Sequence, residues 1–298
     1  MQKFQLASVL VGGAPRPAIG VLSGFQVFPP ELSRDYPSLK AVFEDWSHSF
    51  GRLESYVEEL GGSSGGPDWI PADDAILDLP VRFPNKLIAM GANFADHLAE
   101  MGLPTIKHDP MPIFLMPPTT CMVGPGETVI KPRTTKEFDW ELELAVVIGK
   151  RLKDASLVEA ANAIAGYTIV LDMSARDLIQ IGPPFYIDLV RGKAQDTMAP
   201  CGPAVTPAKF IGDVKNLSMT LFVNDRQMVN GSTADMIFQI DEIISHISQY
   251  ITLEPGDIVL TGAPAGSGKF HKCFLKDGDC IRAQIENVGE LRVKVRES

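Results

Sequence analysis

Short apolar runs separated by turns that contain proline or glycine restrict the fold of this chain more than any other feature of its sequence. The clearest runs are "KLIAMGA" (86–92), "LAVVIG" (144–149), "YTIVLD" (167–172), "DIVLTGA" (257–263) and "LRVKV" (291–295). Apolar runs of this length between turn signals are typical of buried strands. The chain has no regular strand–helix alternation and no internal repeat, so we predict an α+β fold that is predominantly β.

The N-terminal part of the chain combines short strands with one expected helix. Residues 1–29 have the pattern of short strands, with "GGAPRP" as the turn between two of them. In residues 38–60, apolar side chains recur at helical spacing and two glycines follow directly, which predicts a single helix over this segment. The next residues, "GGSSGGPDWIP" (61–71), are polar and rich in glycine, so they predict a linker or an exposed loop.

Beyond this loop the sequence becomes a series of strands with few helices, which indicates a domain boundary. Two further helices are predicted, over residues 154–165 and 238–250. With 298 residues, of which 45% are hydrophobic, the chain can bury a large core in one big domain or two unequal ones. We predict a small N-terminal α/β domain (1–75) and a larger, mostly β domain (76–298).

The composition argues against several classes of function. The net charge is −10, and lysine and arginine form no cluster, which disfavours nucleic-acid binding because phosphate contacts need clustered basic side chains. No apolar stretch approaches the roughly 18 residues of a membrane helix. A secretory signal peptide is disfavoured because Gln5 and Ser8 interrupt the short apolar run near the start. Four cysteines without metal-binding spacing are interpreted as reduced thiols of a cytoplasmic protein: Cys121, Cys201, Cys273 and Cys280.

Two glutamates stand at the beginning of a strongly apolar run. In "EFDWELELAVVIGK" (137–150), Glu141 and Glu143 are two residues apart, so in a strand they point to the same face. Two ionised carboxylates at this spacing repel each other, and burial increases the cost. A shared proton, a basic side chain between them or a divalent cation would each relieve the repulsion. A solvated strand face is the simpler alternative.

A third acid follows another apolar strand. In "GYTIVLDMSARD" (166–177), Asp172 stands where the predicted strand ends. An aspartate there can simply cap the next turn. If the two strands are neighbours, however, Glu141, Glu143 and Asp172 form a face of three oxygen ligands for a hard cation such as Mg²⁺. Zinc fits less well because no histidine or cysteine is close to these acids in the sequence.

Seven segments resemble blocks of the fumarylacetoacetate hydrolase superfamily, in the expected order, from about residue 85 to the C terminus. They are "MGANFADHLAEMG", "FLMPPTTCMVGPGETVIKP", "DWELELAVVIGK", "GYTIVLDMSARD", "RGKAQDTMAPCGP", "MVNGSTADMIF" and "TLEPGDIVLTGAPAGSG". The first 75 or so residues resemble the smaller, variable leading domain of many bacterial members. The resemblance implies a mixed β-roll in the C-terminal domain and a homodimer. It also implies Mg²⁺ or Mn²⁺ at the positions of Glu141, Glu143 and Asp172.

The resemblance also implies catalytic residues. The positions matching His97 and Glu100 form a water-activating dyad in the family's hydrolases, and in a helix their spacing of three puts both side chains on one face. Glu100 would then orient the imidazole and raise its basicity, as a general base requires. Lys193 in "RGKAQDT" matches an active-site lysine close to the bound oxo-acid. Alternatively, His97 and Glu100 are a pair on the surface of a helix, and Lys193 is a surface lysine in a loop.

The resemblance further implies a set of residues around the substrate. Arg176 in "SARD" is expected either to orient Asp172 or Asp177 or to contact the substrate. Gln180 is expected to bind the substrate, one place along from where a family glutamine often stands. Thr261 and Gly262 belong to a segment that resembles the "TGTP" loop at the rim of the family's site.

Several positions depart from the family pattern. Met116 replaces a frequent lysine, Leu171 a common asparagine, Ile179 a glutamine and Ala263 a threonine. "GAPAGSGK" is no phosphate-binding loop either, because Ala263 stands where the motif needs glycine and Phe270 where it needs serine or threonine. These departures surround the expected substrate rather than the metal ligands, so they leave the identity of the substrate open.

The resemblance implies a metal-dependent hydrolase that cleaves a C–C bond in a 2,4-dioxo acid, of the acylpyruvate or fumarylpyruvate type, to pyruvate and a carboxylic acid. His97, held by Glu100, would activate water, while the cation acts as a Lewis acid and Lys193 stabilises the enolate charge. Oxaloacetate decarboxylation and isomerase or hydratase reactions are alternatives at the same site. A third hypothesis is a non-catalytic metal-binding protein, which Met116 and Ala263 favour, whereas the presence of His97, Glu100 and Lys193 argues against it.

Overall fold

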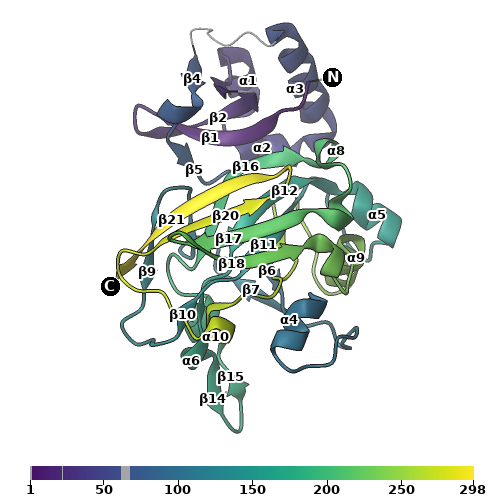
Figure 1. Cartoon of the computed structure of the whole chain (residues 1–298). Coiled ribbons are helices and arrows are strands. Elements are labelled where there is room, and N and C mark those ends of the chain that lie inside the picture. The colour runs from purple at the N-terminus through teal and green to yellow at the C-terminus, as the bar shows by residue number, and fades with distance from the viewer. Residues whose placement is uncertain (1, 22, 62–67) are drawn as a thin grey trace.

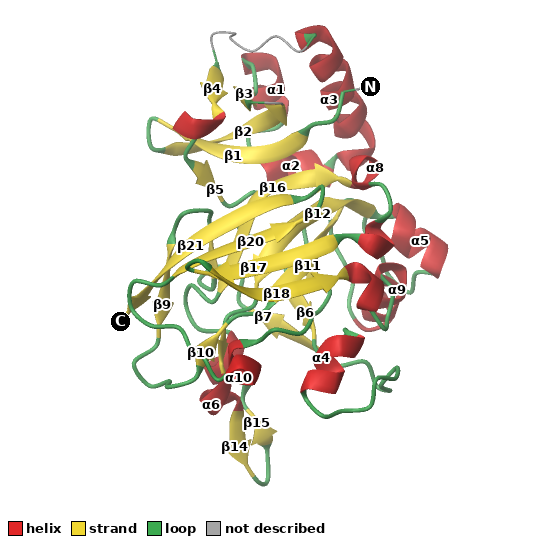
Figure 2. Ribbon diagram, in the orientation of Figure 1, coloured by secondary structure: helices red, strands yellow, loops and turns green. Residues whose placement is uncertain are grey.

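Strands dominate the computed structural model, which describes residues 2–21, 23–61 and 68–298, and two sheets pack against each other in its larger part (Figure 1). Helices lie at the edges of these sheets and beside the N-terminal strands (Figure 2). The predicted α+β, predominantly β fold class is thereby confirmed. Among the described residues, no helix is long and apolar enough to cross a membrane.

The larger sheet has 12 strands and runs through both the N-terminal and the C-terminal parts of the chain. Along its main path the strands are, in spatial order, β4 (Trp69–Pro71), β3 (Gly24–Val27), β2 (Ala14–Val21), β1 (Gln5–Val11), β16 (Ala199–Pro207), β12 (Ile164–Leu171), β11 (Leu142–Ile148), β19 (Ile258–Leu260), β6 (Leu87–Met90) and β7 (Ile113–Met116). Two short strands pair beside this path, β5 (Leu77–Asp78) with β1 and β8 (Met122–Val123) with β16.

The second sheet packs across β11, β12 and β16 of the first. Its five strands are, in spatial order, β18 (Arg226–Ser232), β17 (Ser218–Val223), β20 (Cys280–Ile285), β21 (Gly289–Glu297) and β9 (Thr128–Lys131). Two small two-stranded sheets complete the set, formed by β10 (Phe138–Asp139) with β13 (Ser174–Ala175) and by β14 (Gln180–Gly182) with β15 (Tyr186–Ile187).

Most helices are short. They are α1 (Pro30–Asp35), α2 (Leu39–Glu44), α3 (Trp46–Leu60), α4 (Ala95–Glu100), α5 (Leu157–Asn162), α6 (Arg176–Ile179), α7 (Leu189–Lys193), α8 (Ala208–Ile211), α9 (Ile240–Tyr250) and α10 (Gly268–His271). Single 3₁₀ turns cover Ala72–Asp74, Val214–Asn216 and Thr233–Asp235. Because helices this short have little stability of their own, tertiary packing holds them in place.

Strand β11 is apolar along its whole length because both of its faces are buried. Leu144 and Val146 belong to the core between the two sheets. Ala145 and Val147, on the opposite face, belong to a second core that includes Val42 and Phe43 of α2. Alternating side chains therefore serve two cores, and the acids at the start of β11 stand close to packed apolar groups.

The helix predicted over residues 38–60 is in fact two helices, and the single-helix prediction is wrong at Asp45. This residue has φ −116° and ψ 28°, and it separates α2 from α3. Its carboxylate accepts a hydrogen bond from Tyr36 Oη (2.8 Å) and is hydrogen-bonded to His48 Nδ1 (2.8 Å). These two side-chain bonds hold Asp45 in place between the helices. Helix α3 ends at Gly61 in the left-handed conformation, as expected.

Two other local predictions need correction. The helix expected at 154–165 covers only α5, because Ser156 and Glu159 form a capping box that fixes its start and Ile164 already pairs with β11. The end of the segment predicted as a loop, 61–71, is strand β4 on the edge of the large sheet, while residues 62–67 lie outside the described chain. The helix predicted at 238–250 is present as α9.

The N-terminal strands are continuous with the larger part of the molecule. Strand β1 pairs with β16 through Leu6 and Val205, and it also pairs with β5. The second core joins α2 and α3 to β11, β12 and β16. The boundary near residue 75 stays a prediction, and it would divide a shared sheet and a shared core.

Candidate active site

The register of β11 and β12 brings the three predicted acids together. Leu142 pairs with Leu171, so Asp172 lies opposite Glu141, and the Asp172 N–H donates to the Glu141 carbonyl at 2.9 Å. Glu143 lies two residues further along β11. One carboxylate oxygen from each acid lies within 4.8 Å of those of the other two. The structure therefore brings Glu141, Glu143 and Asp172 into one cluster.

This cluster fits a hard divalent cation. The buried Asp172 Oδ1 has no hydrogen-bond donor among the described residues. Glu143 accepts a hydrogen bond from the Gly262 backbone N–H, which comes from the turn after β19 and leaves carboxylate capacity free. Three converging carboxylates, one of them with an unsatisfied buried oxygen, form an all-oxygen donor set, which suits Mg²⁺ or Mn²⁺ better than it suits softer metals.

The electrostatics of the cluster are those of a site with too much negative charge. Burial raises the pKa of Asp172 to about 7, and repulsion by Glu141 adds to the effect. Burial and the charges of Asp172 and Glu141 likewise raise the pKa of Glu143 well above its usual value. The ammonium of Lys193, at the end of α7, donates to Asp172 Oδ2 (2.6 Å) and to Glu141. A basic side chain and a raised pKa both relieve the repulsion.

Glu141 differs from its neighbours because two cations face it. Arg176 donates to Glu141 Oε1 at 2.7 Å, and its Nε donates to Asp139 Oδ1 at 2.7 Å. Burial alone would raise the pKa of Glu141, but Arg176 and then Lys193 outweigh it and hold the pKa well below its usual value. Arg176 contacts neither Asp172 nor Asp177 in the hydrogen-bond network of the described residues, so the prediction that it orients one of those two is wrong. It orients Glu141 and Asp139 instead.

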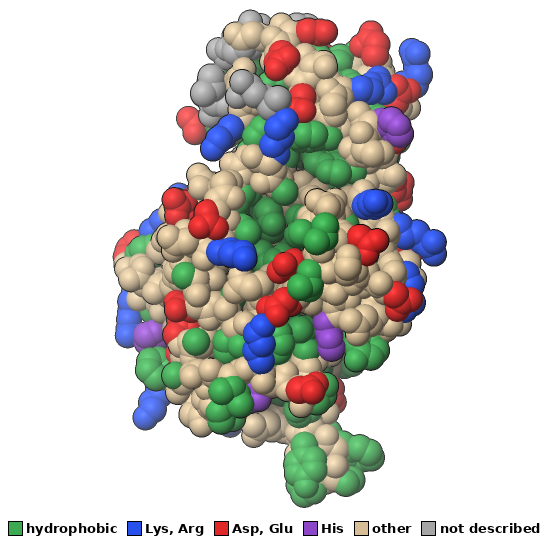
Figure 3. Space-filling model, turned by 90° about the vertical axis from the view of Figure 1, so that its right-hand side faces the viewer, with side chains coloured by type: hydrophobic (Ala, Val, Ile, Leu, Met, Phe, Trp, Pro, Cys, Tyr) green, Lys and Arg blue, Asp and Glu red, His purple; other side chains and the backbone are tan. Residues whose placement is uncertain are grey.

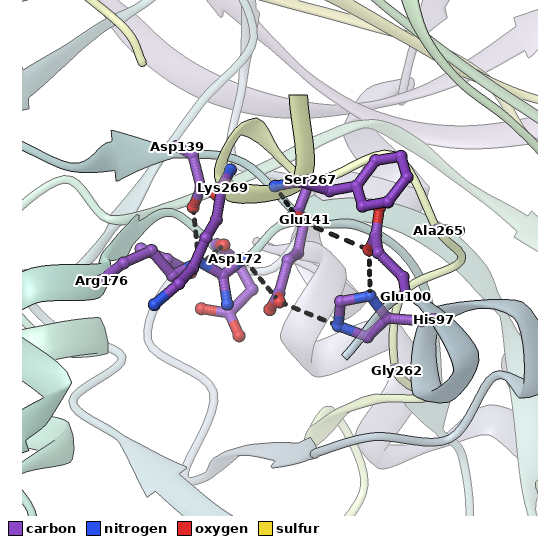
Figure 4. Close-up of polar contacts among 12 residues, drawn as sticks. His97, Glu100, Asp139, Glu141, Asp172, Arg176, Gly262, Ala265, Ser267 and Lys269 are labelled. Atoms are coloured by element: carbon purple, nitrogen blue, oxygen red, sulfur yellow. Dashed lines mark hydrogen bonds and ion pairs between the residues drawn. The ribbon is translucent and has the colours of Figure 1, made fainter. Parts of the chain in front are cut away.

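His97 is held between two carboxylates (Figure 4). Its Nδ1 lies 2.7 Å from Glu100 Oε2, and its Nε2 lies 3.5 Å from Glu141 Oε1. Both His97 and Glu100 are carried by α4, where the spacing of three puts them side by side as predicted. Burial lowers the pKa of His97, but its bonds to Glu100 and Glu141 outweigh this and raise the pKa to about 9.

The loop before α10 docks onto the start and the end of α4. Glu100 Oε1 accepts the Gly266 N–H at 2.9 Å, and Glu100 Oε2 accepts the Ser267 hydroxyl at 3.4 Å. Asp96 Oδ2 accepts the Ala265 N–H at 3.1 Å. Because these bonds fix the Glu100 carboxylate, the imidazole of His97 also has one preferred orientation.

A cavity of about 780 Å³ opens beside His97, Glu100 and Arg176. Its remaining lining comes from Met101, Leu103, Ile179, Gln180, Ser267, Lys269, Phe270 and Lys272. The volume suits a small organic ligand. The cavity therefore joins the histidine pair to a space for a substrate.

The four residues predicted to contact substrate have different positions. Arg176 and Gln180 line the cavity. Thr261 is fully buried, and its hydroxyl donates to the Leu144 carbonyl at 2.9 Å. Gly262 is also buried. Its φ is +93°, and a Cβ added there would lie only 2.7 Å from Asn93 Cβ, so the position requires glycine. Its backbone N–H donates to Glu143. Neither Thr261 nor Gly262 is among the residues that line the cavity.

Sequence reasoning missed Asp139, which is fully buried. It accepts hydrogen bonds from Arg176 Nε and from the Lys269 N–H (2.9 Å), so it ties α6 to α10. A signal was present, because Asp139 precedes Glu141 by two residues and extends the alternation of acids to three positions. Trp140 and Phe138 on either side are buried, as in a strand that continues into β11.

The raised pKa values predict that metal binding strengthens with pH. Asp172, with a pKa of about 7, and Glu143, with a raised pKa, must lose protons before a cation binds. Affinity should rise by up to about tenfold per pH unit for each proton released between pH 6 and 8. The metal-free protein should lose stability as pH rises from about 4 to about 7, because in this range folded Asp172 still holds a proton that the unfolded chain has already released. Melting curves at pH 5, 6, 7 and 8, with EDTA or with Mg²⁺, check both trends. A Tm of the metal-free protein that does not fall between pH 5 and 7, or a gain in Tm with Mg²⁺ that does not grow with pH, would contradict them.

The chain is similar to known enzymes over most of its length. The family profile described as fumarylacetoacetate (FAA) hydrolase C-terminal matches residues 86–296. A mitochondrial oxaloacetate tautomerase of Bos taurus, FAHD2A, is 40% identical over 228 residues, which cover 76% of this chain and 71% of the relative. A 2,4-didehydro-3-deoxy-L-rhamnonate hydrolase of a Sphingomonas species (strain SKA58) is 39% identical over 257 residues, 82% of this chain and 86% of the relative.

A solved structure is similar over nearly the entire chain. The maleylpyruvate hydrolase of Sphingobium sp. SYK-6, crystallised with manganese(II) and pyruvate, superposes with a TM-score of 0.80. The identity is 28%, and the match covers 99% of each chain. These findings confirm the resemblance that the sequence blocks indicated. The chain belongs to the fumarylacetoacetate hydrolase family.

Proposed function

We propose that this protein is a Mg²⁺- or Mn²⁺-dependent hydrolase that cleaves a C–C bond in a 2,4-dioxo acid to give pyruvate and a carboxylic acid. The observation that carries the proposal is the position of His97, bonded to Glu100 at 2.7 Å and facing a cavity of about 780 Å³. A histidine–carboxylate pair beside a substrate space is suited to activating water. The maleylpyruvate hydrolase similar to this chain supports the same reaction class.

The hydrogen bonds of His97 define its part in the reaction. Since Nδ1 faces the Glu100 carboxylate, the neutral imidazole carries its proton there, and the lone pair of Nε2, 3.5 Å from Glu141 Oε1, can take a proton from water. The hydroxide adds to the distal carbonyl of the substrate, and the C–C bond breaks with its electron pair left on the pyruvate part. The proton held on Nε2 can then return to that carbanionic carbon, which balances the addition of one water.

Lys193 and Arg176 supply positive charge to the site. The buried ammonium of Lys193, whose pKa the charges of Asp172 and Glu141 raise against the effect of burial, stays protonated and can stabilise the enolate. Arg176 keeps Glu141 ionised. A divalent cation held by Glu141, Glu143 and Asp172 would polarise the substrate carbonyls and, by reducing the negative charge near His97, bring the pKa of the imidazole towards neutrality.

A second candidate function is an isomerase or decarboxylase reaction on oxaloacetate. The 40% identity with an oxaloacetate tautomerase favours this alternative. The same histidine could move a proton between the enol oxygen and the neighbouring carbon, with no attack by water. The two candidates share the metal cluster and differ in whether water attacks a carbonyl of the substrate.

A proton NMR time course with Mg²⁺ separates these functions. Acetylpyruvate, fumarylpyruvate, oxaloacetate and a sugar-derived diketo acid would each be incubated with the protein and with an EDTA-treated control. A hydrolase gives pyruvate and the matching acid in equal amounts. A tautomerase only speeds exchange between keto and enol forms, and a decarboxylase gives pyruvate and CO₂ from oxaloacetate. The proposal is wrong if no dioxo acid is cleaved in a metal-dependent way.

We further propose that the protein is cytoplasmic and forms a homodimer. The β14–β15 hairpin would contact the partner subunit. The hairpin projects from the molecule with apolar side chains at its end (Figure 3). Phe185 is 80% exposed, Tyr186 62% and Ile187 58%. A projecting apolar group of this kind favours contact with another protein surface. Light scattering should give twice the chain mass of 32.4 kDa, and Phe185→Asp should shift the protein towards the monomer.

A further inference from the structure

Asp139 is a buried acid that contacts two walls of the substrate cavity at once. Its side chain is 0% exposed, and both of its oxygens are engaged. Oδ1 accepts a hydrogen bond from Arg176 Nε at 2.7 Å, and Oδ2 accepts the Lys269 N–H at 2.9 Å. Arg176 begins α6 and Lys269 belongs to α10, and both residues line the cavity. One carboxylate therefore holds these two helices together from behind the cavity wall.

The backbone of α10 lies directly against Asp139. A Cβ added to Gly268 would lie 2.6 Å from Asp139 Cβ and 3.2 Å from the ring of Trp140. A helix can approach the acid this closely only because position 268 has no side chain. The hydrogen bond from the next residue, Lys269, depends on this close approach.

The neighbours of Asp139 bind the same segment of the chain. Trp140 is fully buried, and its indole Nε1–H donates to the Gly266 carbonyl at 3.1 Å. The Phe138 carbonyl accepts the Leu275 N–H at 2.8 Å. Three consecutive residues thus hydrogen-bond to segment 266–275 at three points, with the Asp139 carboxylate in the middle.

This segment in turn holds the histidine pair. The Gly266 N–H donates to Glu100 Oε1 at 2.9 Å, and the Ser267 hydroxyl donates to Glu100 Oε2 at 3.4 Å. Glu100 Oε2 lies 2.7 Å from His97 Nδ1. The orientation of the imidazole therefore depends, through Glu100, on where residues 138–140 hold the segment.

Arg176 connects Asp139 to the carboxylate cluster on the other side. Its Nε is held by Asp139, and its Nη2 donates to Glu141 Oε1 at 2.7 Å. Because the guanidinium is planar and rigid, a bond that fixes one of its nitrogens also fixes the direction of the others. In the close-up, Asp139, Arg176 and Lys269 lie on one side of Glu141, and His97 and Glu100 lie on the other (Figure 4).

We propose that Asp139 is a positioning residue for both halves of the active site. Through Arg176 it fixes the carboxylate of Glu141, and through the backbone of α10 it fixes the loop that orients Glu100 and His97. Asp139 is not among the residues that line the cavity, so it acts through these neighbours and contacts no substrate. The kinetic part of this inference rests on the proposed function, whereas the part that concerns metal binding does not depend on the reaction.

Asp139→Asn is the sharpest test, because an amide has a single oxygen. No orientation of asparagine can accept hydrogen bonds from both Arg176 and the Lys269 N–H. Affinity for Mg²⁺, measured by calorimetric titration, should fall about 10–100-fold, the usual cost of losing a group that orients a metal ligand. With saturating Mg²⁺, kcat for acetylpyruvate cleavage should also fall about 10–100-fold, since a displacement of about 1 Å at a catalytic group costs this much.

Asp257→Asn is the matched control. Asp257 is also 0% exposed, and its two oxygens accept the N–H groups of Lys86 (2.8 Å) and Glu254 (2.7 Å). It belongs neither to the cavity lining nor to the carboxylate cluster. Both variants should lower Tm, because each leaves a buried donor without its acceptor. Only Asp139→Asn should lower affinity for Mg²⁺ and kcat.

Two further variants separate the two routes. If Asp139 acts on Glu141 through Arg176, the double variant Asp139→Asn/Arg176→Lys should lose no more affinity for Mg²⁺ than the weaker-binding single variant, instead of the product of the two losses. Trp140→Phe removes only the bond to the Gly266 carbonyl. It should lower kcat about two- to tenfold, the range for one hydrogen bond, and leave affinity for Mg²⁺ unchanged.

Each outcome decides one part of the inference. An Asp139→Asn protein with a lowered Tm but wild-type Mg²⁺ affinity and kcat would make Asp139 a structural residue like Asp257. Multiplied losses in the double variant would overturn the route through Arg176, and full kcat in Trp140→Phe would overturn the route through α10, even where Asp139→Asn does not fold. If the wild type cleaves no dioxo acid, the proposed reaction is wrong, and the Mg²⁺ titrations still decide whether Asp139 positions the metal ligand.

Discussion

His97→Gln should lower kcat for acylpyruvate cleavage by about 10²–10⁴-fold, the usual contribution of a positioned general base. Glutamine can keep a polar contact to Glu100 but cannot accept a proton from water at neutral pH. The substitution removes no member of the carboxylate cluster, so affinity for Mg²⁺ should stay within a few-fold of the wild type. Steady-state kinetics and calorimetric titration with Mg²⁺ measure the two effects separately.

Two companion variants make this result specific. Glu100→Gln should also lower kcat, because the amide loosens the orientation of the imidazole that Gly266 and Ser267 now support through the carboxylate. His48→Gln makes the same chemical change on exposed α3 and should leave kcat unchanged. A His97→Gln protein with full kcat would show that His97 is not the general base and that another group takes the proton from water.

Glu143→Gln should have opposite effects on the protein with and without metal. Loss of one of three carboxylate ligands should weaken Mg²⁺ binding by at least about 100-fold, since even groups outside the ligand set cost 10–100-fold. Turnover should fall with it. In metal-free protein at pH 8 the same change should raise Tm, by about 2–4 °C for each kcal/mol of repulsion relieved, because a neutral amide replaces a buried carboxyl crowded by Asp172 and Glu141.

Thermal melting with EDTA and with excess Mg²⁺ shows both effects in one experiment. The wild type should gain about 2.7 kcal/mol at a hundredfold excess of Mg²⁺ over Kd, and Glu143→Gln should gain little. Glu58→Gln, on the exposed face of α3, is the matched control and should behave as the wild type. A Glu143→Gln protein that Mg²⁺ still stabilises fully would show that this side chain is no ligand.

The convergence of the three acids was predictable from the sequence because it depends on short-range rules. Side chains two apart in a strand share a face, and Asp172 stands at the end of an apolar run that pairs with the run after Glu141. The pairing of His97 with Glu100 is equally local, since both are on one helical turn. Contacts within a few residues, or between two adjacent strands, can therefore be predicted from the spacing of residues in the sequence.

Contacts between distant segments left no such pattern. Asp139 meets Lys269, which is 130 positions away in the chain, through a hydrogen bond to a backbone N–H that any residue could donate. Arg176 bonds to Asp139 and Glu141 rather than to the acids nearest to it in sequence, because the pairing of β10 with β13 turns its side chain towards the cluster. At the break between α2 and α3, Asp45 likewise accepts a hydrogen bond from Tyr36, which lies before α2.

The pairing of β1 with β16 gives the leading segment a protective part in this fold. Without residues 1–75, the part of β16 around Val205 would become an open edge of the large sheet, while β8 would still cover Ala199 and Pro200. The apolar face of β11 that α2 covers would be exposed to water. Unpaired strand edges and wide apolar patches promote aggregation. The leading segment can therefore vary in sequence only while it still covers the edge of β16 and the apolar face of β11. This requirement sets a minimum length for the leading segment in any shorter relative with the same sheet.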